Sequence, residues 1–314
     1  MATTTAPAPE YAAATERCGL LDRSERGKLA LTGAGAKDFL QGQVSNDVAA
    51  LTPGTGCYAA FLTPKGKMLG DLRVLDTDVE LLLDTERVSL QPLFNLIRRG
   101  MIGYEAELHK RTLERGLLSL IGPDAQAVAG ADGLLATEHS HAEIEVNGVP
   151  VRAIRTDLGF DLLCDATRTG ELRQALQNAG AAPVSEATAE CVRIEHGRPR
   201  YGVELDDGVI PQEAGLNERA VSFTKGCYVG QETVARLHYR GKPNRVLRGL
   251  RLSAPVGAGT PLELGDREVG RVGSSAVSPG FGPIGLALVR REAEPGSLLT
   301  VGGAEAEVVE LPFG

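Results

Sequence analysis

The segment FTKGCYVGQETVARLHYRG, residues 223–241, combines a glycine-rich turn with the start of a helix. Gly226 and Gly230 flank a cysteine, and glycine lets the backbone turn sharply and approach a ligand closely. The residues from Glu232 to Leu237 predict a short helix, because an acidic side chain lies in its first turn, basic side chains lie near its end, and a glycine follows. The segment therefore predicts a tight turn that leads directly into a helix.

Cys227 is the candidate reactive residue of this segment. It precedes the predicted helix N-terminus and lies two residues from Lys225, and both features favour a thiolate over a thiol. The alternative is a buried cysteine that packs in a tight turn, since most cysteines are buried and inert. From the residues alone, this packing role is the stronger interpretation.

Outward from this segment, strands alternate with amphipathic helices. Residues 57–75 predict two strands joined by a turn at 63–66, because proline presets one turn dihedral and glycine tolerates the next. Asn147 and Gly148 predict a second hairpin, and Ser185 is a typical start for a helix that ends before Gly197. The pattern is typical of α+β units with antiparallel sheets. After Gly241, short Val/Leu runs between Gly and Pro turns predict a small β-barrel or sandwich, with the boundary near 242–245.

The composition limits the class of protein. A chain of 314 residues is longer than a single core usually organises, so we expect two or three packed units. The formal net charge of -8 repels phosphate backbones, and we therefore expect no stable binding to nucleic acid. The five cysteines are dispersed without a C-x-x-C pair, which argues against a disulfide framework and against a resident iron-sulfur cluster.

The N-terminus lacks the pattern of a secretion signal, and no apolar run is long enough to cross a bilayer. We expect a cytoplasmic protein without a membrane partner, whose first 19 residues form a short disordered lead-in.

The octapeptide KGCYVGQE, residues 225–232, resembles the signature of the YgfZ-type folate-binding proteins, which are relatives of the glycine-cleavage T-protein (aminomethyltransferase, GcvT-like) superfamily. Eight contiguous residues with two glycines and one cysteine form a specific match. The similarity continues in the family's order from about residue 30 to the end of the chain. It includes FLQGQVSNDV (39–48), KGKMLGDLRV (65–74), GFDLLC (159–164), RIEHGRPRYG (193–202) and IPQEAGL (210–216).

The resemblance implies an α+β, T-protein-like ring of three domains around a central cavity. Residues 17–50 and 115–198 would form a first, discontinuous α+β domain, and residues 51–114 and 199–243 would form a second. Residues 244–314 would form a C-terminal β-barrel.

The resemblance also implies tetrahydrofolate, or a related folate, as the cofactor. It implies iron-sulfur enzymes or their assembly factors as partners, including enzymes of tRNA modification.

Glu195 lies in the segment that matches the family's pterin-contacting helix, and a carboxylate can accept two adjacent N–H donors of a pterin edge. The alternative for Glu195 is a solvated helix acid beside Arg193. We predict Cys227 as the functional thiol, with folate contacts from Glu195, Lys225, Gly226, Tyr228, Gly230, Gln231 and Arg240.

The cations and aromatic residues near this segment have ordinary alternatives. Lys225, Arg236 and Arg240 would suit the anionic glutamate tail of folate, but each is equally consistent with surface charge. A flat aromatic ligand would suit Tyr58, Tyr201 or Tyr228, although an isolated tyrosine more often serves packing.

One departure from the T-protein bears on activity. T-proteins carry an aspartate near the start of the helix that follows the strand matching Val79–Leu83, and that aspartate assists one-carbon transfer. The matching place here, around Leu90 and Gln91, has no carboxylate, although Asp84 and Glu86 lie nearby. This argues against general acid-base assistance.

Three hypotheses follow: an accessory protein that binds folate, a folate-dependent aminomethyl- or methyltransferase, and a scaffold that has lost folate binding. Whether the chain is an enzyme stays open.

His139 and His141, in the tripeptide HSH, are a weaker signal. They would bind a metal only with partners from elsewhere, so a polar loop is the better interpretation.

Overall fold

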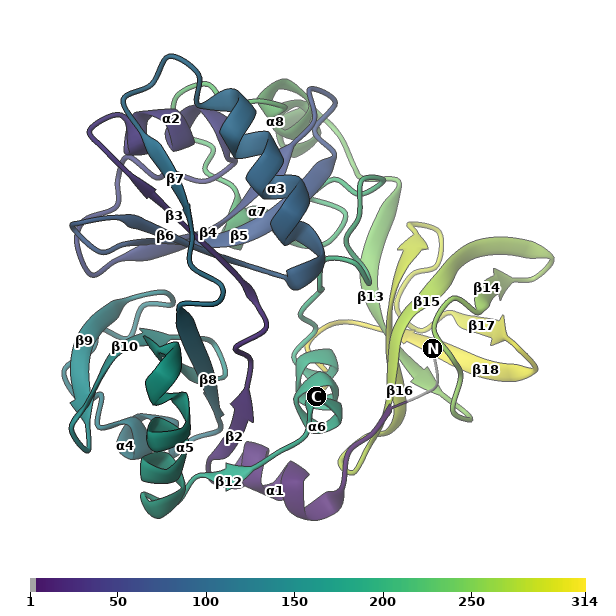
Figure 1. Cartoon of the computed structure of the whole chain (residues 1–314). Coiled ribbons are helices and arrows are strands. Elements are labelled where there is room, and N and C mark those ends of the chain that lie inside the picture. The colour runs from purple at the N-terminus through teal and green to yellow at the C-terminus, as the bar shows by residue number, and fades with distance from the viewer. Residues whose placement is uncertain (1–3) are drawn as a thin grey trace.

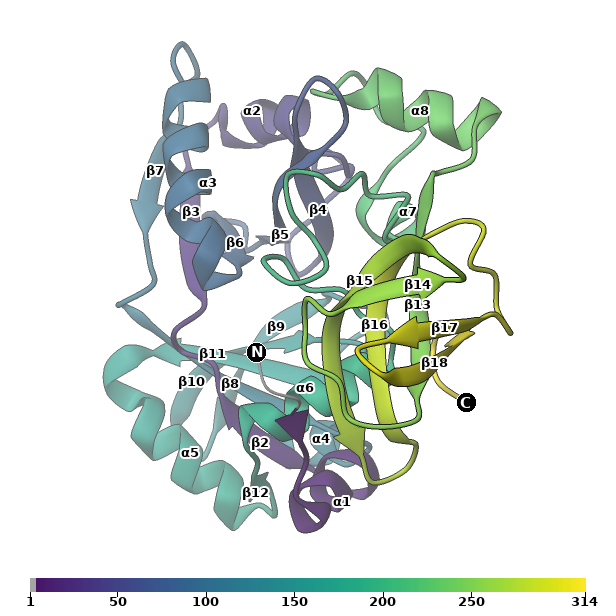
Figure 2. The same cartoon turned by 90° about the vertical axis from the view of Figure 1, so that its right-hand side faces the viewer.

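The computed structural model describes residues 4–314 and consists of two α+β domains and a β-barrel (Figures 1 and 2). The sheets confirm the predicted T-protein-like, three-domain class. No helix within residues 4–314 is long and apolar enough to span a membrane.

The upper domain in Figure 1 contains a five-stranded antiparallel sheet. Its strands are β3 (Gly27–Thr32), β4 (Gly56–Leu62), β5 (Met68–Asp76), β6 (Leu81–Thr85) and β7 (Glu107–Lys110), in the order β4-β5-β6-β3-β7. Its helices are α2 (Ala36–Gln43), α3 (Arg87–Gly100), α7 (Asn217–Ala220) and α8 (Gln231–Arg240). The predicted hairpin is confirmed: Gly66 adopts a φ of 75° in the turn between β4 and β5. The apolar stripe of α3 packs into the core below it, through Leu93 and Ile97.

The strand pairing differs from the predicted domain ranges at residues 27–50. We expected this segment in the first α+β domain, but β3 pairs with β6 and β7 in the second. The connection between the domains therefore lies between β3 and the preceding strand β2 (Gly19–Asp22). Leu29 and Leu31 are buried, as is Ala30 on the opposite face. A strand that is apolar on both faces fits the interior of either sheet, so its pattern does not identify its neighbours.

The lower domain contains a six-stranded sheet in the order β12-β2-β8-β11-β10-β9. Its remaining strands are β8 (Arg115–Ile121), β9 (His141–Val146), β10 (Val149–Arg155), β11 (Gly159–Asp165) and β12 (Ala182–Pro183). Its helices are α4 (Ala125–Ala129), η1 (Ala166–Arg168), α5 (Thr169–Asn178) and α6 (Glu186–Glu195). Asn147 and Gly148 both have positive φ between β9 and β10, which confirms the second predicted hairpin. The Ser185 side chain caps α6 by accepting from the backbone N–H of Thr188, as predicted.

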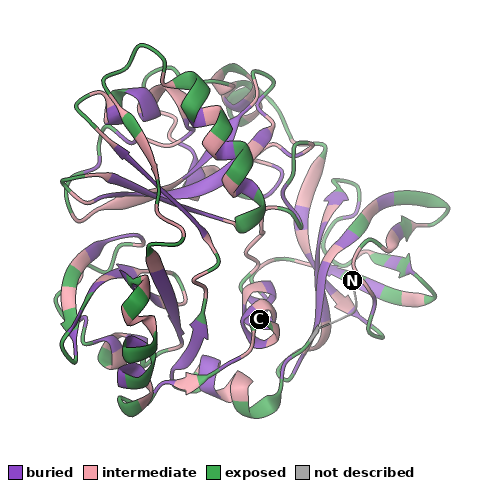
Figure 3. Cartoon of the chain, in the orientation of Figure 1, coloured by how far each residue is buried: buried purple, intermediate pink, exposed green. Residues whose placement is uncertain are grey.

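The C-terminal domain is a closed barrel, which confirms the predicted change of character after Gly241. Its strands are β13 (Arg245–Leu252), β14 (Pro261–Leu264), β15 (Arg267–Ser278), β16 (Gly282–Arg290), β17 (Leu298–Val301) and β18 (Ala304–Val309). The pairing of β15 with β16 closes the ring of strands. Figure 3 shows buried residues along the sheets and exposed residues on the outer helices, which is the expected layering.

The predicted disordered lead-in is wrong for residues 4–19, whereas residues 1–3 lie outside the described part. Strand β1 (Thr4–Thr5) adds to barrel strand β15, and α1 (Ala8–Glu16) packs against α6. The Glu10 carboxylate accepts hydrogen bonds from the backbone and side chain of Ser185 at 2.7 and 2.5 Å. The N-terminal segment thus ties the barrel to the lower domain. The composition of the N-terminal segment did not reveal that it is folded, because its alanines are buried only against partners distant in sequence.

Candidate functional site

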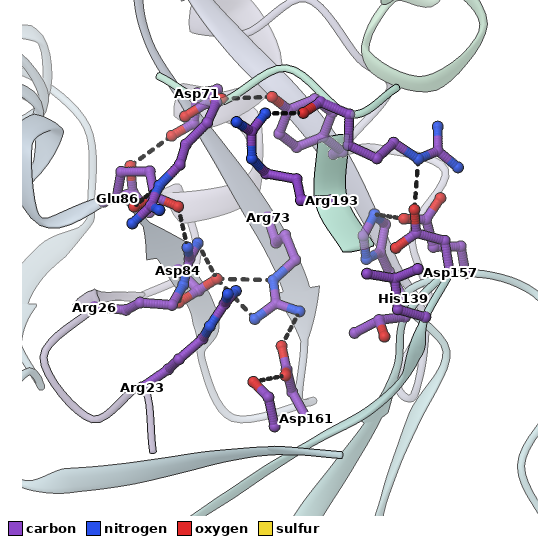
Figure 4. A pocket seen from close by; sticks show the side chains of 18 of the residues that line it. Arg23, Arg26, Asp71, Arg73, Asp84, Glu86, His139, Asp157, Asp161 and Arg193 are labelled. Carbon is purple, nitrogen blue, oxygen red and sulfur yellow. Dashed lines mark hydrogen bonds and ion pairs between the residues drawn. The ribbon is translucent and has the colours of Figure 1, made fainter. Parts of the chain in front are cut away.

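The central cavity, of about 200 Å³, lies between the two α+β domains (Figure 4). Residues from β5, β6, β8 and β11 line it, together with residues 198–201, which follow α6. Seven arginines and six carboxylates contribute to the wall, so positive and negative groups nearly balance. Pockets that bury a whole drug-sized ligand usually measure roughly 300–1,000 Å³. The cavity is therefore suited to one polar end of such a ligand.

Arg73 holds the two domains together at the cavity wall. Its guanidinium donates to Asp84 of the upper domain at 2.7 and 2.8 Å and to Asp161 of the lower domain at 2.6 Å (Figure 4). Asp84 also accepts two hydrogen bonds from Arg26, and Asp161 accepts one from Ser119. Burial raises the pKa of Asp84, but the two arginines outweigh burial and hold that pKa well below its usual range. Asp84 is therefore an ion-pair partner and a poor proton acceptor.

Asp71 is a second buried carboxylate in the wall. Its side chain accepts a hydrogen bond of 2.5 Å from the Tyr58 hydroxyl. Burial raises the pKa of Asp71 to about 6, against the lowering effect of the Tyr58 hydrogen bond. A carboxyl group with a pKa near neutrality can give and take a proton at physiological pH. Asp71 therefore has the property that a general acid-base group needs.

The start of α3 carries no free carboxylate. Glu86 immediately precedes the helix, where Arg26 and Arg200 bind its carboxylate. Burial raises the pKa of Glu86, but these arginines and Arg23 lower it overall. Both acids near the expected catalytic position, Asp84 and Glu86, are thus paired with arginine.

The octapeptide lies on the upper domain, and none of its residues lines this cavity. Lys225 donates to the backbone carbonyls of Gln41, Val44 and Asn46 at 2.6–2.8 Å, in the last turn of α2 and just after it. Burial lowers the pKa of its ammonium group to about 8. Lys225 therefore anchors the octapeptide to the end of α2, and a contact with the folate tail would require it to leave these carbonyls.

The glycines and the tyrosine of the octapeptide have separate roles. Gly230 has a φ of 85°, and a Cβ there would lie 2.5 Å from the Thr63 carbonyl oxygen, so packing against the β4–β5 turn demands glycine. Gly226 faces open space among the described residues. Tyr228 is buried in the upper domain, with its ring 5.1 Å from the Lys225 ammonium. Gly230 and Tyr228 thus have structural explanations that need no ligand.

Cys227 is exposed, whereas the other four cysteines, all in the described part of the chain, are buried or half-buried. The buried packing role that the residues alone favoured is therefore not the observed one. Gln231 begins α8 and is half-buried, and Arg240 ends it and is exposed. The thiol is accessible to a partner, but not from within the cavity.

Glu195 lies at the end of α6 and is buried beside the barrel, and it is not among the residues that line the cavity. Its carboxylate accepts hydrogen bonds from Ser278 at 2.5 Å, from Tyr11 at 3.2 Å and from the Cys191 thiol at 3.5 Å. It is thus not the solvated acid that was the alternative. Its assignment to the pterin stays a prediction, and binding would require the carboxylate to exchange these partners.

The residues named from the sequence that line the cavity include Tyr58, Tyr201, Asp84 and Glu86. Sequence reasoning missed other lining residues, above all Arg73, Asp161 and the place of His139. One signal was present for the first two. Arg73 lies within MLGDLRVLD and Asp161 within GFDLLCD, and both are charged residues inside apolar strands. Such residues are buried only when they are paired. His139 had no comparable signal, because the polar-loop interpretation fits its neighbours.

The fold and the cavity define the class: a three-domain protein with two α+β units, a closed barrel and a charged cavity between the α+β units. Two family models match the chain, the GCVT N-terminal domain at residues 2–225 and the CAF17 C-terminal beta-barrel domain at residues 245–312. The chain therefore belongs to the GCVT family, the family of the glycine-cleavage T-protein.

Individual relatives agree with this family. An aminomethyltransferase of Synechococcus sp. is 31% identical, over 97% of this chain and 89% of its own length. An aminomethyltransferase of Rubrobacter xylanophilus is 30% identical, over 97% of this chain and 85% of its own length. A putative chloroplastic transferase of Arabidopsis thaliana is 28% identical, over 94% of this chain and 71% of its own length. The crystal structure of aminomethyltransferase T of the glycine cleavage system from Bartonella henselae superposes with a TM-score of 0.86 at 24% identity, covering 98% and 89% of the two chains, and supports the fold.

Proposed function

We propose that this protein binds a tetrahydrofolate with its pterin end in the central cavity. We further propose that it acts in the cytoplasm, as a YgfZ-type member of the family, in the maturation or repair of iron-sulfur enzymes, including tRNA-modifying ones. The observation that carries the folate proposal is the cavity itself. It is small, and its wall alternates carboxylates with guanidinium groups, in a chain of the GCVT family.

The chemistry of a pterin suits this wall. A pterin ring presents adjacent N–H donors beside a carbonyl acceptor, so a carboxylate and a guanidinium on one wall can bind its edge together. The anionic glutamate tail is then left outside, since a cavity of about 200 Å³ holds only part of a folate.

Calorimetry tests the folate proposal. We expect tetrahydrofolate and a tetrahydropterin without the tail to bind, and p-aminobenzoylglutamate, which is the tail alone, to bind much more weakly. Absence of binding by tetrahydrofolate would reject the proposal in favour of a scaffold that has lost the ligand. Binding by the tail alone would show that the pterin does not occupy the cavity.

Two features of the structure support the accessory role. The acids near the start of α3 are paired with arginine, so the carboxylate that assists one-carbon transfer in T-proteins has no free counterpart there. Cys227, by contrast, is exposed on the surface of the upper domain, where a client protein can reach it.

Complementation in a strain that lacks the gene tests the thiol. Cys227→Ala should preserve the unfolding midpoint and the affinity for tetrahydrofolate, while failing to restore iron-sulfur enzyme activity. Cys164→Ala, which removes a buried thiol outside the octapeptide, is the control and should restore activity. Full restoration by Cys227→Ala would exclude a functional thiol.

Folate-dependent aminomethyl transfer is the second candidate, and Asp71 favours it. This carboxyl group lines the cavity and has a pKa near neutrality, and several relatives are named aminomethyltransferases. The hypothesis predicts methylenetetrahydrofolate from an aminomethyl-lipoyl carrier and a large loss of kcat in Asp71→Asn. No product at high enzyme concentration would exclude it.

A further inference from the structure

His139 has a backbone conformation that few residues with a side chain adopt. Its φ is 68°, in the left-handed region, and the surrounding chain holds it there. The N–H of His139 donates to the Arg155 carbonyl at 2.9 Å, and Arg155 in turn donates to the carbonyl of Ser140. The next residue, His141, donates to the Gly54 carbonyl of the upper domain at 2.8 Å. Strain that persists in such a firmly held segment is often linked to function.

The imidazole of His139 lacks the hydrogen bonds that a buried ring normally makes. The residue is 6% exposed and forms part of the cavity wall (Figure 4). Neither ring nitrogen has a hydrogen-bond partner within residues 4–314. The nearest acid, Glu138, lies 3.6 Å from Nε2, beyond hydrogen-bond distance, and is already paired with Arg219. Buried polar atoms are almost always paired, so this ring is incomplete without another group.

The ring is neutral at physiological pH. Burial, with a smaller contribution from the nearby Arg73 and Arg219, lowers the pKa of His139 to about 4, despite the raising effects of Glu138 and Asp157. A neutral imidazole has one N–H donor and one bare nitrogen acceptor. His139 therefore offers one donor and one acceptor to whatever enters the cavity.

We propose that His139 is a further ligand contact of the central cavity, and that its imidazole hydrogen-bonds to the planar nitrogen heterocycle bound there. This inference rests on the proposed folate function and adds a residue to the same site. A ligand group that pairs with this ring must offer an acceptor to its N–H or a donor to its bare nitrogen; a pterin ring offers both, and a purely aliphatic ligand offers neither. His139 forms part of the cavity wall, and because Glu138 is paired with Arg219, neither ring nitrogen has a hydrogen-bond partner among the described residues.

The test compares tetrahydrofolate binding to the full-length protein and its variants by calorimetry. His139→Phe keeps a flat ring but removes both nitrogens, so affinity should fall about tenfold or more. His238→Phe is the control, because His238 is exposed on α8 and stacks on Phe223 at 3.8 Å, a contact that phenylalanine preserves. Its affinity should equal that of the wild type.

A second variant and a spectroscopic measurement guard against misfolding. His139→Asn tolerates positive φ but is too short to reach the same atoms, so it should also bind weakly. The imidazole ¹⁵N shifts of His139, assigned by their absence in His139→Phe, should move when tetrahydrofolate is added. Apo His139→Phe should be at least as stable as the wild type, because it removes two unpaired buried nitrogens.

The outcomes separate the two proposals. If the wild type binds tetrahydrofolate and both variants bind equally well, or the ¹⁵N shifts stay unchanged, the role of His139 is overturned while the folate function stands. If the wild type does not bind, the folate function fails and the ligand assigned to His139 fails with it.

Discussion

Replacing Arg73 by methionine should destabilise the junction between the α+β domains. Removing one partner of a buried ion pair usually costs about 3–5 kcal/mol, because a charge stays buried without compensation. Here Asp84 keeps both hydrogen bonds from Arg26, and Asp161 keeps the one from Ser119. We therefore expect the lower end of that range, about 3 kcal/mol. With an unfolding entropy of about 2.1 cal/mol/K per residue, the thermal midpoint of this 314-residue chain should fall by roughly 5 °C.

The assay is thermal and urea unfolding of Arg73→Met, followed by both circular dichroism and tyrosine fluorescence. Arg248→Met is the control, because it removes an arginine paired with the exposed Glu310 and should cost at most about 1 kcal/mol. Adding Asp161→Asn to Arg73→Met removes the uncompensated charge, so the double variant should lose less than the sum of the two single variants. A loss below about 1 kcal/mol for Arg73→Met, or strict additivity in the double variant, would refute the assigned role of this ion pair.

Three other structural arguments are tested by substitution. Gly230→Ala should lower the free energy of unfolding in urea by about 1–3 kcal/mol, because a Cβ there meets the Thr63 carbonyl at positive φ. The control Gly226→Ala should change it by at most about 0.5 kcal/mol. Equal losses in the two variants would contradict the packing argument. Asp71 has a pKa raised in the folded state, so its contribution to stability is present below its unfolded pKa and is lost as pH rises through about 6. Between pH 4 and 7, the stability of Asp71→Asn relative to the wild type should therefore rise by about 2–3 kcal/mol, and a pH-independent difference would oppose the assignment. Glu10→Ala should lower stability by about 1–2 kcal/mol through lost hydrogen bonds to the start of α6, and an unchanged midpoint would show that the N-terminal segment is not held there.

Local patterns predicted the individual elements well. The turn at residues 63–66, the positive-φ hairpin at Asn147 and Gly148, and the cap at Ser185 each depend on neighbours in the chain, and all three are observed. The octapeptide likewise indicated the correct fold, because the residues that match a family share its long-range packing. What it did not indicate is which of its own residues serve that packing, as Lys225 and Gly230 do.

The candidate site was harder to predict, because its parts meet only in the tertiary structure. Arg73 on β5 and Asp161 on β11 are 88 positions apart along the chain, yet their side chains lie 2.6 Å apart. The burial of Glu195 depends on Ser278 of the barrel and on Tyr11 of the N-terminal helix, both distant in the sequence. Glu195 and the octapeptide, which we predicted to contact one folate, are likewise not among the residues that line the cavity.

The sequence by itself determined the two hairpin turns, the start of α6, the barrel boundary and the family, because turn chemistry and hydrophobic period act over a few residues. Only the tertiary structure decided that residues 27–50 join the upper sheet, that the N-terminus ties the barrel to the lower domain, and that His139 faces a charged cavity. An apolar strand can be buried in more than one sheet, and an ionic side chain can be buried only where a distant partner compensates its charge. Both choices depend on contacts between residues far apart in the chain, which a local pattern does not contain.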